Sequence, residues 1–323
     1  MRGLVIHDQE LSYRDDLPEP ACPPGSVRIQ VLQAGVCSTD LALVRGYMGF
    51  AGTPGHEFVG IALEGAHAGQ RVVGEINAAC GDCSWCGADL GRHCPDRSVL
   101  GILNHGGCFA EQIVLPEANL LPVPDVVSND AATFTEPLAA AFEILEQLPE
   151  LRDETALVIG DGRLGLLCAR VLHDRGLAVT VSGHHPERQA LLPPAVPIRE
   201  RWVTATTAPQ PFDLVVEATG NPAVLQTALP WVRPRGTLLL KTTSEATAPL
   251  DLALAVINEI QILGSRCGRF EPALAAFSAT PDHGGYDPTA MIDARFPLAD
   301  GVAALAHAAK PGVLKVIIEV AAK

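Results

Sequence analysis

The sequence predicts an α/β protein of two domains, one β-rich and one built on a doubly wound parallel sheet. The first observation is length, because 323 residues exceed one typical domain. The second is a change of pattern near residue 130. Before it, short alternating apolar segments are separated by prolines and glycines, and after it strands alternate with helices. Strand–helix alternation indicates βαβ units on a parallel sheet.

The β-rich part contains short segments whose apolar residues recur at strand spacing. We expect strands at residues 4–6, 27–31, 58–63, 71–75 and 110–115. A helix is expected over 131–148, where apolar residues follow a helical period.

The second half repeats a strand and a helix several times. We expect strands at residues 156–159, 177–181, 214–217, 237–241 and 260–263, with helices at 164–174 and near 223–229. The segment 193–211 holds five prolines and is expected to be a loop with little helix. The tail combines helix signals at 272–278 and 301–308 with a last strand at 314–320, and we expect it to rejoin the β-rich domain.

Composition excludes several classes of protein. A net charge of −14 argues against a nucleic-acid partner, which would need a basic face. No apolar run is long enough for a membrane span, and the apolar start is too brief for a signal peptide. We therefore expect a cytoplasmic protein that does not enter membranes and whose partner is a small molecule.

Four cysteines lie within 15 residues, at Cys80, Cys83, Cys86 and Cys94. This C-x2-C-x2-C-x7-C spacing lets a short loop place four thiolates around one ion. Zn²⁺ bound by four sulfurs has no open position, so such a site would support structure and would not perform chemistry. The absence of a secretory signal argues against disulfides. An Fe–S cluster remains the competing metal group on spacing alone.

A G-x-G-x-x-G motif joins a predicted strand to a predicted helix. The first glycine, Gly160, makes the tight turn, Gly162 lets the backbone approach a pyrophosphate, and Gly165 allows close packing of helix on strand. Arg163 and Leu164 begin the helix, whose N-terminus stabilises phosphate charge. In this context the motif predicts dinucleotide binding.

The end of the next predicted strand bears on the choice of nucleotide. An acid that binds the ribose 2′-hydroxyl of NAD is expected there, but Ser182 and Gly183 occupy the position. Gly183 leaves room for a 2′-phosphate, and His184 and Arg188 offer it donors. The sequence therefore favours NADP over NAD. The alternative is that the histidines and Arg188 are solvated residues at the start of a helix.

Three further fragments carry possible ligands of a second metal. Cys37 follows a predicted strand, His56 and Glu57 begin another, and Glu136 opens the long predicted helix. Cys37, His56 and one of the two glutamates would give three ligands and leave a fourth position open, as a catalytic zinc requires.

Two neighbouring residues could assist that metal. Asp40 could accept the second ring N–H of His56 and fix its tautomer. The hydroxyl of Thr39 or of Ser38 could begin a path for a proton to solvent. Taken alone, each of these residues would fit an ordinary core position at least as well as a metal site.

In this order, the motifs resemble those of the zinc-containing medium-chain dehydrogenase/reductase family, over nearly the whole chain. The matching segments are G-V-C-S-T-D (35–40), G-H-E (55–57), the four-cysteine lobe, G-G-C-F-A-E (106–111), T-E-P-L-A-A (135–140), the glycine motif, D-L-V-V-E-A-T-G (213–220) and I-L-G-S (262–265). The resemblance implies a GroES-like catalytic domain of residues 1–137 and 267–323, with the zinc lobe at 79–95, and a Rossmann domain of residues 138–266.

The resemblance also implies two zinc ions per chain and selects zinc over Fe–S for the four cysteines. Glu136 stands where classical alcohol dehydrogenases carry a third ligand cysteine, and this resembles the polyol and threonine dehydrogenase branch. In that branch the zinc can also use the Glu of G-H-E, so Glu57 and Glu136 both stay candidates. Family members are dimers or tetramers, which implies a homodimer or homotetramer here.

The expected activity is a zinc-dependent transfer of hydride between NAD(P) and a secondary alcohol or ketone, such as a polyol, sugar or cyclitol (EC 1.1.1.-). One alternative is a dehydrogenase of primary alcohols or aldehydes. Another is an NADPH-binding protein without catalytic activity.

Overall fold

The computed structural model of the protein describes residues 1–201, 203, 211–243, 246–279 and 285–321. The chain divides into two compact units, one of Met1–Glu136 with Arg269–Lys323 and one of Pro137–Gly268. A β-rich unit and a unit with a parallel sheet confirm the predicted α/β fold class. Among the helices of the described residues, none is both long and apolar enough to cross a membrane.

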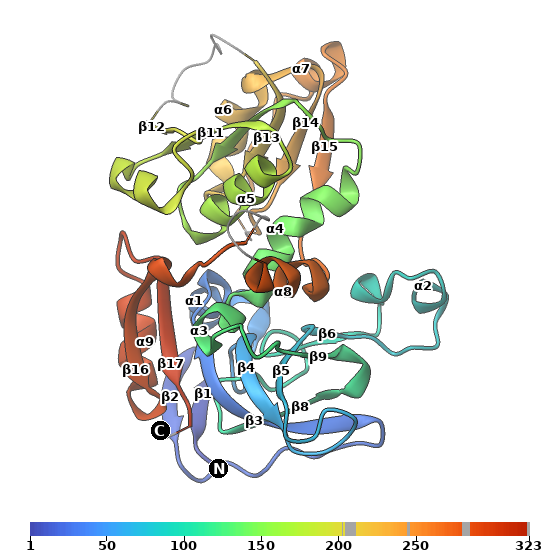
Figure 1. Cartoon of the computed structure of the whole chain (residues 1–323), viewed down its shortest axis with the longest axis vertical. Helices are drawn as coiled ribbons and strands as arrows, with labels where there is room; N and C mark the ends of the chain where they lie inside the picture. Colours follow the sequence, from blue (N-terminus) through green and yellow to red (C-terminus); the bar gives the residue numbers. More distant parts are fainter. Residues whose placement is uncertain (202, 204–210, 244–245, 280–284, 322–323) are drawn as a thin grey trace. The chain divides into compact units, whose positions relative to one another are not determined.

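The first unit is built on a seven-stranded sheet in which six strands follow the order β16-β17-β3-β4-β5-β9 and β8 also pairs with β3. The central strand is β3 (Ser26–Gly35), whose inward side chains Val27, Ile29 and Val31 are buried. The first half of β3 pairs with β8 (Gln112–Pro116), and its last residues pair with β17 (Lys315–Glu319). Figure 1 shows the C-terminal strand beside strands from the start of the chain.

The remaining elements of this unit surround that sheet. The strands are β1 (Gly3–His7), β2 (Glu10–Arg14), β4 (Glu57–Ala62), β5 (Arg71–Gly74), β6 (Asn77–Ala78), β7 (Ser98–Val99), β9 (Leu120–Pro122) and β16 (Ile292–Pro297). The helices are α1 (Ser38–Val44), α2 (Ser84–Gly87), α3 (Asn129–Thr133), α8 (Phe270–Ser278) and α9 (Gly301–Ala308).

The second unit is a six-stranded parallel sheet with the order β12-β11-β10-β13-β14-β15. The strands are β10 (Thr155–Ile159), β11 (Ala178–Gly183), β12 (Ile198–Glu200), β13 (Phe212–Glu217), β14 (Val232–Leu240) and β15 (Gln261–Gly264). The chain starts in the middle, runs to one edge and returns to build the other half. This is the 3-2-1-4-5-6 order of a doubly wound fold, whose ligands bind outside the carboxyl ends of the strands where the order reverses.

Helices connect these strands, namely α5 (Arg163–Asp174), α6 (Leu225–Ala228) and α7 (Leu252–Ile257), and α4 (Thr135–Gln147) precedes them. One core cluster packs Leu157 and Val215 of the central strands against Trp231, which is 1% exposed. The strands are buried along most of their length because helices cover the sheet.

Two expectations for individual elements differ from the structure. The single helix predicted over 131–148 is two helices, with the break at Phe134. Pro137 has no N–H to donate to an earlier turn, so it fits only in the first turn of a helix that starts anew at Thr135. The predicted loop 193–211 contains the short strand β12, and residues 202 and 204–210 of that segment lie outside the described residues.

Candidate functional site

The four-cysteine lobe brings its sulfurs together. The Sγ atoms of Cys80, Cys83, Cys86 and Cys94 lie within 4.8 Å of one another, and none of the four is in a disulfide. The Cys83–Cys86 and Cys80–Cys94 sulfur pairs are 3.5 Å apart, and the Cys83–Cys94 and Cys80–Cys86 pairs are 3.8 Å apart. Four thiolates about 2.3 Å from a tetrahedral zinc are roughly 3.8 Å from each other. The lobe therefore fits a zinc ion.

The thiols of this lobe also influence each other's ionisation. Desolvation, followed by hydrogen bonds to the three neighbouring thiols, raises the pKa of Cys86 to about 12. A bound divalent cation acts in the opposite direction, since a coordinating thiol loses its proton.

A second cluster lies at one end of the pair formed by β3 and β4. Gly35 and Glu57 are opposite each other in this antiparallel pair, so Cys37, just past β3, comes close to His56, just before β4. Ligand atoms of Cys37, His56 and Glu57 all lie within 4.8 Å of one another. His56 is 3% exposed and Glu57 is 0% exposed, so these two donors are shielded from water, whereas Cys37 is half-buried.

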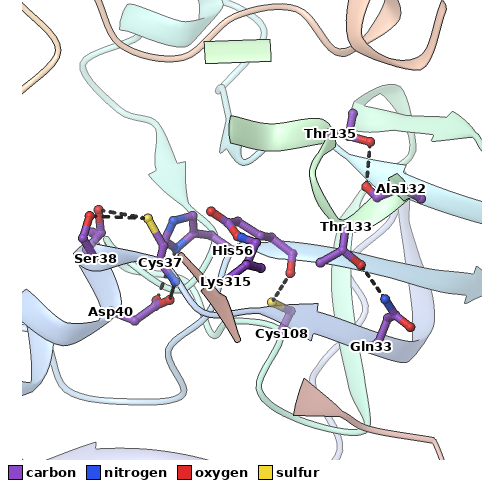
Figure 2. A network of polar contacts seen from close by, with 12 residues as sticks. Gln33, Cys37, Ser38, Asp40, His56, Cys108, Ala132, Thr133, Thr135 and Lys315 are labelled. Carbon is purple, nitrogen blue, oxygen red and sulfur yellow. Dashed lines mark hydrogen bonds and ion pairs between the residues drawn. The ribbon is translucent and has the colours of Figure 1, made fainter. Parts of the chain in front are cut away.

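Asp40 holds the two sides of this cluster together. Its Oδ2 accepts a hydrogen bond of 2.8 Å from the backbone N–H of Cys37, and its Oδ1 accepts one of 3.2 Å from that of Gly55. Oδ1 also lies 3.3 Å from Nδ1 of His56, close enough for an ion pair although not aligned as a hydrogen bond. The buried carboxylate thus lies beside the imidazole, as Figure 2 shows.

The protonation of His56 follows from these neighbours. Burial lowers its pKa, but the interactions with the nearby Asp40 and Cys37 side chains outweigh this, and the pKa lies well above the usual value. An imidazole held between a carboxylate and a sulfur atom marks a place that a metal cation would fit, because metal binding displaces protons from such ligands.

Two hydroxyl groups approach the sulfur of Cys37. The thiol donates to Oγ1 of Thr39 over 3.7 Å. Oγ of the exposed Ser38 lies 4.0 Å from the sulfur, and Figure 2 shows Ser38 beside Cys37. Both hydroxyls named in the sequence analysis are therefore near the cluster, on the first turn of α1.

The two candidate glutamates differ in their placement. Glu57 belongs to the set of close ligand atoms, whereas Glu136, half-buried in the first turn of α4, does not. Cys108 is also buried nearby and donates to the backbone oxygen of Glu57 over 3.7 Å. Burial, and then the charges of Asp40 and Glu57, raise the pKa of the Cys108 thiol well above its usual value, so it remains protonated.

Sequence reasoning missed Lys315, which forms an ion pair with Oε2 of Glu57. Both side chains are 0% exposed, and the Lys315 ammonium lies 5.0 Å from the centroid of the Phe134 ring. Lys315 is the first residue of β17, and nothing near it in the sequence marks it as a partner of the G-H-E segment.

The glycine motif occupies the turn between β10 and α5. Gly160 has a φ of +112°, and a Cβ there would lie 2.7 Å from the backbone oxygen of Ala218. A Cβ at Gly165 would lie 1.9 Å from the oxygen of Gly160, so a side chain would push the helix off the strand. Around Gly162 nothing lies within 4 Å of such an atom, which leaves space for a phosphate. Arg163 and Leu164 follow as the first turn of α5.

The end of β11 lies beside this turn, because Ile159 pairs with Ser182. Gly183 ends the strand, His184 is exposed, and Arg188 is 8% exposed. Sequence reasoning missed Asp161, the residue between the first two glycines, whose carboxylate reaches this strand end. The sequence signal that could have identified Asp161 is that two neighbouring parallel strands both end at this place.

Comparisons with known proteins agree with these features. The alcohol dehydrogenase GroES-like domain matches residues 23–125. The sequence is 31% identical over 343 residues to the L-threonine 3-dehydrogenase of Streptomyces avermitilis, covering 99% of each chain. Its fold is similar to that of the alcohol dehydrogenase rspB of Escherichia coli CFT073 complexed with NADH, with a TM-score of 0.88, 23% identity and 99% of each chain covered.

A second solved structure, described as a zinc-binding dehydrogenase of Sinorhizobium meliloti 1021 bound to NADP, has a TM-score of 0.85 and 23% identity over 99% of each chain. At this identity the two structures establish the fold. The similarity to threonine dehydrogenase over the full length of both chains establishes the family. The chain belongs to the zinc-containing medium-chain dehydrogenase/reductase family, in the branch that includes polyol and threonine dehydrogenases.

Proposed function

We propose that the protein is a zinc-dependent dehydrogenase that transfers a hydride between NAD(P) and a secondary alcohol or its ketone. Family membership supports the general activity, an NAD(P)-dependent alcohol oxidoreductase. The substrate class we propose is a polyol, sugar or cyclitol, or another polar secondary alcohol. The relative from Streptomyces is named for a reaction at carbon 3 of threonine, which carries a secondary hydroxyl.

The observation that carries the proposal is the close set of the half-buried Cys37 and the buried His56 and Glu57. Three protein ligands of these types match a catalytic zinc site, which keeps a position for substrate, and the four-cysteine lobe matches a closed structural site. Glu57 is the carboxylate that the geometry favours as third ligand. Glu136 remains the other candidate, through a rearrangement or a bridging water.

When bound, zinc would polarise the alcohol oxygen and lower its pKa. The residues of the chain provide the rest. Asp40 keeps Cys37 and His56 in register through its contacts with both sides of the cluster. The Thr39 hydroxyl, half-buried beside the Cys37 sulfur, would pass the alcohol proton toward solvent. The glycine turn after β10 would hold the pyrophosphate of the nicotinamide nucleotide.

The test combines metal content with turnover. Zinc should be quantified by mass spectrometry on the purified protein, with NAD and NADP reduction assayed on polyols, L-threonine and aliphatic primary alcohols. We expect about two zinc ions per chain and turnover on polar secondary alcohols. Cys37→Ala should remove one zinc equivalent and abolish turnover.

Cys22→Ser serves as the control, because Cys22 is a half-buried thiol of the same unit outside both clusters. It should keep both zinc ions and full activity. Undiminished turnover in Cys37→Ala would overturn the proposal. Turnover confined to primary alcohols would support the alternative dehydrogenase, and nucleotide binding without any turnover would support a non-catalytic protein.

A further inference from the structure

Asp161 lies where the glycine turn meets the end of β11. Its side chain is 7% exposed, and its Oδ2 accepts hydrogen bonds of 2.8 and 2.6 Å from the backbone N–H groups of His184 and His185. In sequence, Asp161 belongs to the turn after β10, but its carboxylate lies at the carboxyl end of the neighbouring strand β11.

The absence of a side chain at Gly183 provides the space that the Asp161 carboxylate occupies. A Cβ at Gly183 would lie 2.3 Å from both Cγ and Oδ2 of Asp161 and 2.5 Å from its Cβ. The backbone of Gly183 is not in the left-handed region, so these contacts with Asp161 are what a side chain there would meet first. Asp161 therefore fills the space that a side chain at position 183 would take.

In dinucleotide-binding folds, an acid at the end of the second strand hydrogen-bonds the ribose 2′-hydroxyl of NAD, and an arginine nearby accommodates the 2′-phosphate of NADP. Here the strand end has glycine, and the acid arrives from the neighbouring turn. We propose that Asp161 is the residue that selects the nucleotide, accepting a hydrogen bond from the ribose 2′-hydroxyl and excluding a 2′-phosphate, so that the enzyme prefers NAD. This inference rests on the proposed function, since it concerns the same cofactor.

Two features make this strand end unfavourable for a 2′-phosphate. Successive backbone N–H groups form the kind of concave site that binds anions, but those of His184 and His185 already donate to Asp161. A phosphate placed there would lose these donors and would face a carboxylate, and like charges at contact distance are strongly disfavoured.

Arg188, the residue that the sequence suggests as a phosphate donor, is directed to the same aspartate. Its Nη1 donates to the backbone oxygen of Asp161 over 2.6 Å and lies 3.5 Å from Oδ1. Being 8% exposed, Arg188 supports the turn instead of extending into solvent. The sequence favours NADP because it lacks an acid at Ser182 or Gly183, and Asp161 supplies that acid from the neighbouring turn.

Binding of NADH and NADPH to the full-length protein, measured by calorimetry without substrate, tests the inference. The wild-type protein should bind NADH more tightly by about tenfold or more. Asp161→Asn keeps the shape and an acceptor for the backbone N–H groups but removes the charge, so the ratio should shift toward NADPH by about tenfold.

The double variant Asp161→Gly with Gly183→Asp moves the carboxylate back to the strand end and should restore the preference for NADH. Gly183→Asp alone places two side chains in one space and should weaken the binding of both nucleotides. Asp174→Asn is the matched control, since Asp174 forms an exposed pair with Arg170 on the same unit, and it should leave the ratio unchanged.

The outcomes separate this inference from the proposed function. Binding of neither nucleotide would overturn both. Equal or tighter binding of NADPH by the wild-type protein would overturn the inference alone. A fall in affinity of Asp161→Asn for both nucleotides in equal proportion would also overturn it, because that result would mean that Asp161 only shapes the turn.

Discussion

At the scale of single residues, the stability of the first unit depends most strongly on the ion pair of Lys315 and Glu57. Both side chains are fully buried, so neither charge is screened by water. Placing charges in the interior costs several kcal/mol per ion, and their attraction roughly offsets this only while both are present. The pair is therefore neutral or modest in its net contribution, yet sensitive to loss of one partner.

Lys315→Met should destabilise the first unit by about 3–5 kcal/mol, because Glu57 would remain as a buried charge without its ammonium. Urea denaturation of the zinc-depleted protein measures the change. The double variant Lys315→Met with Glu57→Gln should recover much of the loss, since both charges are then gone. Lys310→Met, at an exposed lysine of the same segment, should have little effect. A cost for Lys315→Met no larger than that of Lys310→Met would contradict the argument.

The residues of the candidate site differ in how visible they are in the sequence. Cys37, His56 and the four lobe cysteines are visible because metal ligands come in restricted types and spacings. Lys315 is not, since it is 258 residues from Glu57 and reaches it only because β17 and β4 both pair with β3. Asp161 is also not recognisable from its place in the sequence alone, because its role depends on where β11 ends.

At the scale of elements, Asp213 joins the beginnings of three neighbouring strands. It accepts hydrogen bonds from the N–H and the hydroxyl of Thr155 on β10, and it pairs with Arg233 on β14. Desolvation raises the pKa of Asp213, but the hydrogen bonds from Thr155 and Arg233 lower it more, and the net pKa lies below its ordinary value of 3.8.

A lowered pKa gives a defined dependence of stability on pH. Between the native pKa and 3.8, the unfolded chain binds more protons than the native one, so stability falls as the pH decreases through this range. Asp213→Asn should be less stable than the wild-type protein at neutral pH, and the difference should shrink as the pH falls below 3.8.

The measurement is urea denaturation of both proteins from neutral pH into acid. Thr155→Val removes one donor but keeps the carboxylate, so it should reduce the same pH-dependent difference without abolishing it. A difference between Asp213→Asn and wild type that is constant with pH would show that the lowered pKa contributes nothing.

Elements with strong local patterns were predictable, and those defined by their neighbours were not. The helix expected over 164–174 is α5 (Arg163–Asp174), because its apolar residues repeat with the helical period. Strand β16 (Ile292–Pro297) was not predicted, although its apolar residues alternate with Asp293 and Arg295, because it is a short edge segment that ends in a proline. Its pairing with β17 defines it.

At the scale of the whole molecule, the first unit is discontinuous in sequence, and the tail completes it. β17 lies between β16 and β3 within the sheet, so residues 1–136 lack an internal strand and the partner of Glu57. The second unit, in contrast, is one continuous segment with its own core.

Residues 137–268 expressed alone should therefore fold and bind a nicotinamide nucleotide, whereas residues 1–136 alone should not fold. Dispersion of amide signals in NMR spectra checks folding, and calorimetry with NADH checks binding. Joining residues 269–323 to 1–136 through a flexible linker should restore a folded first unit. A well-dispersed spectrum from residues 1–136 alone would contradict this view of the tail.

The expectation of a homodimer or homotetramer stays a prediction. β15 lies at the end of the parallel sheet, and Leu252, Val256 and Ile257 of the preceding helix α7 expose more than half of their surface. Exposed apolar side chains beside a sheet edge are the surface at which association of subunits can be examined first.

The shared space of Asp161 and Gly183 also constrains how such a sequence can change. Adding an acid at position 183 first crowds the existing one, and losing Asp161 first leaves the strand end without an acid. Neither single step leads to the common arrangement through a well-formed intermediate. Because the two side chains would share one space, we expect positions 161 and 183, which are 22 residues apart in sequence, to change together. If Asp161 selects the nucleotide, the residue at the strand end does not by itself predict whether a chain of this type uses NAD or NADP.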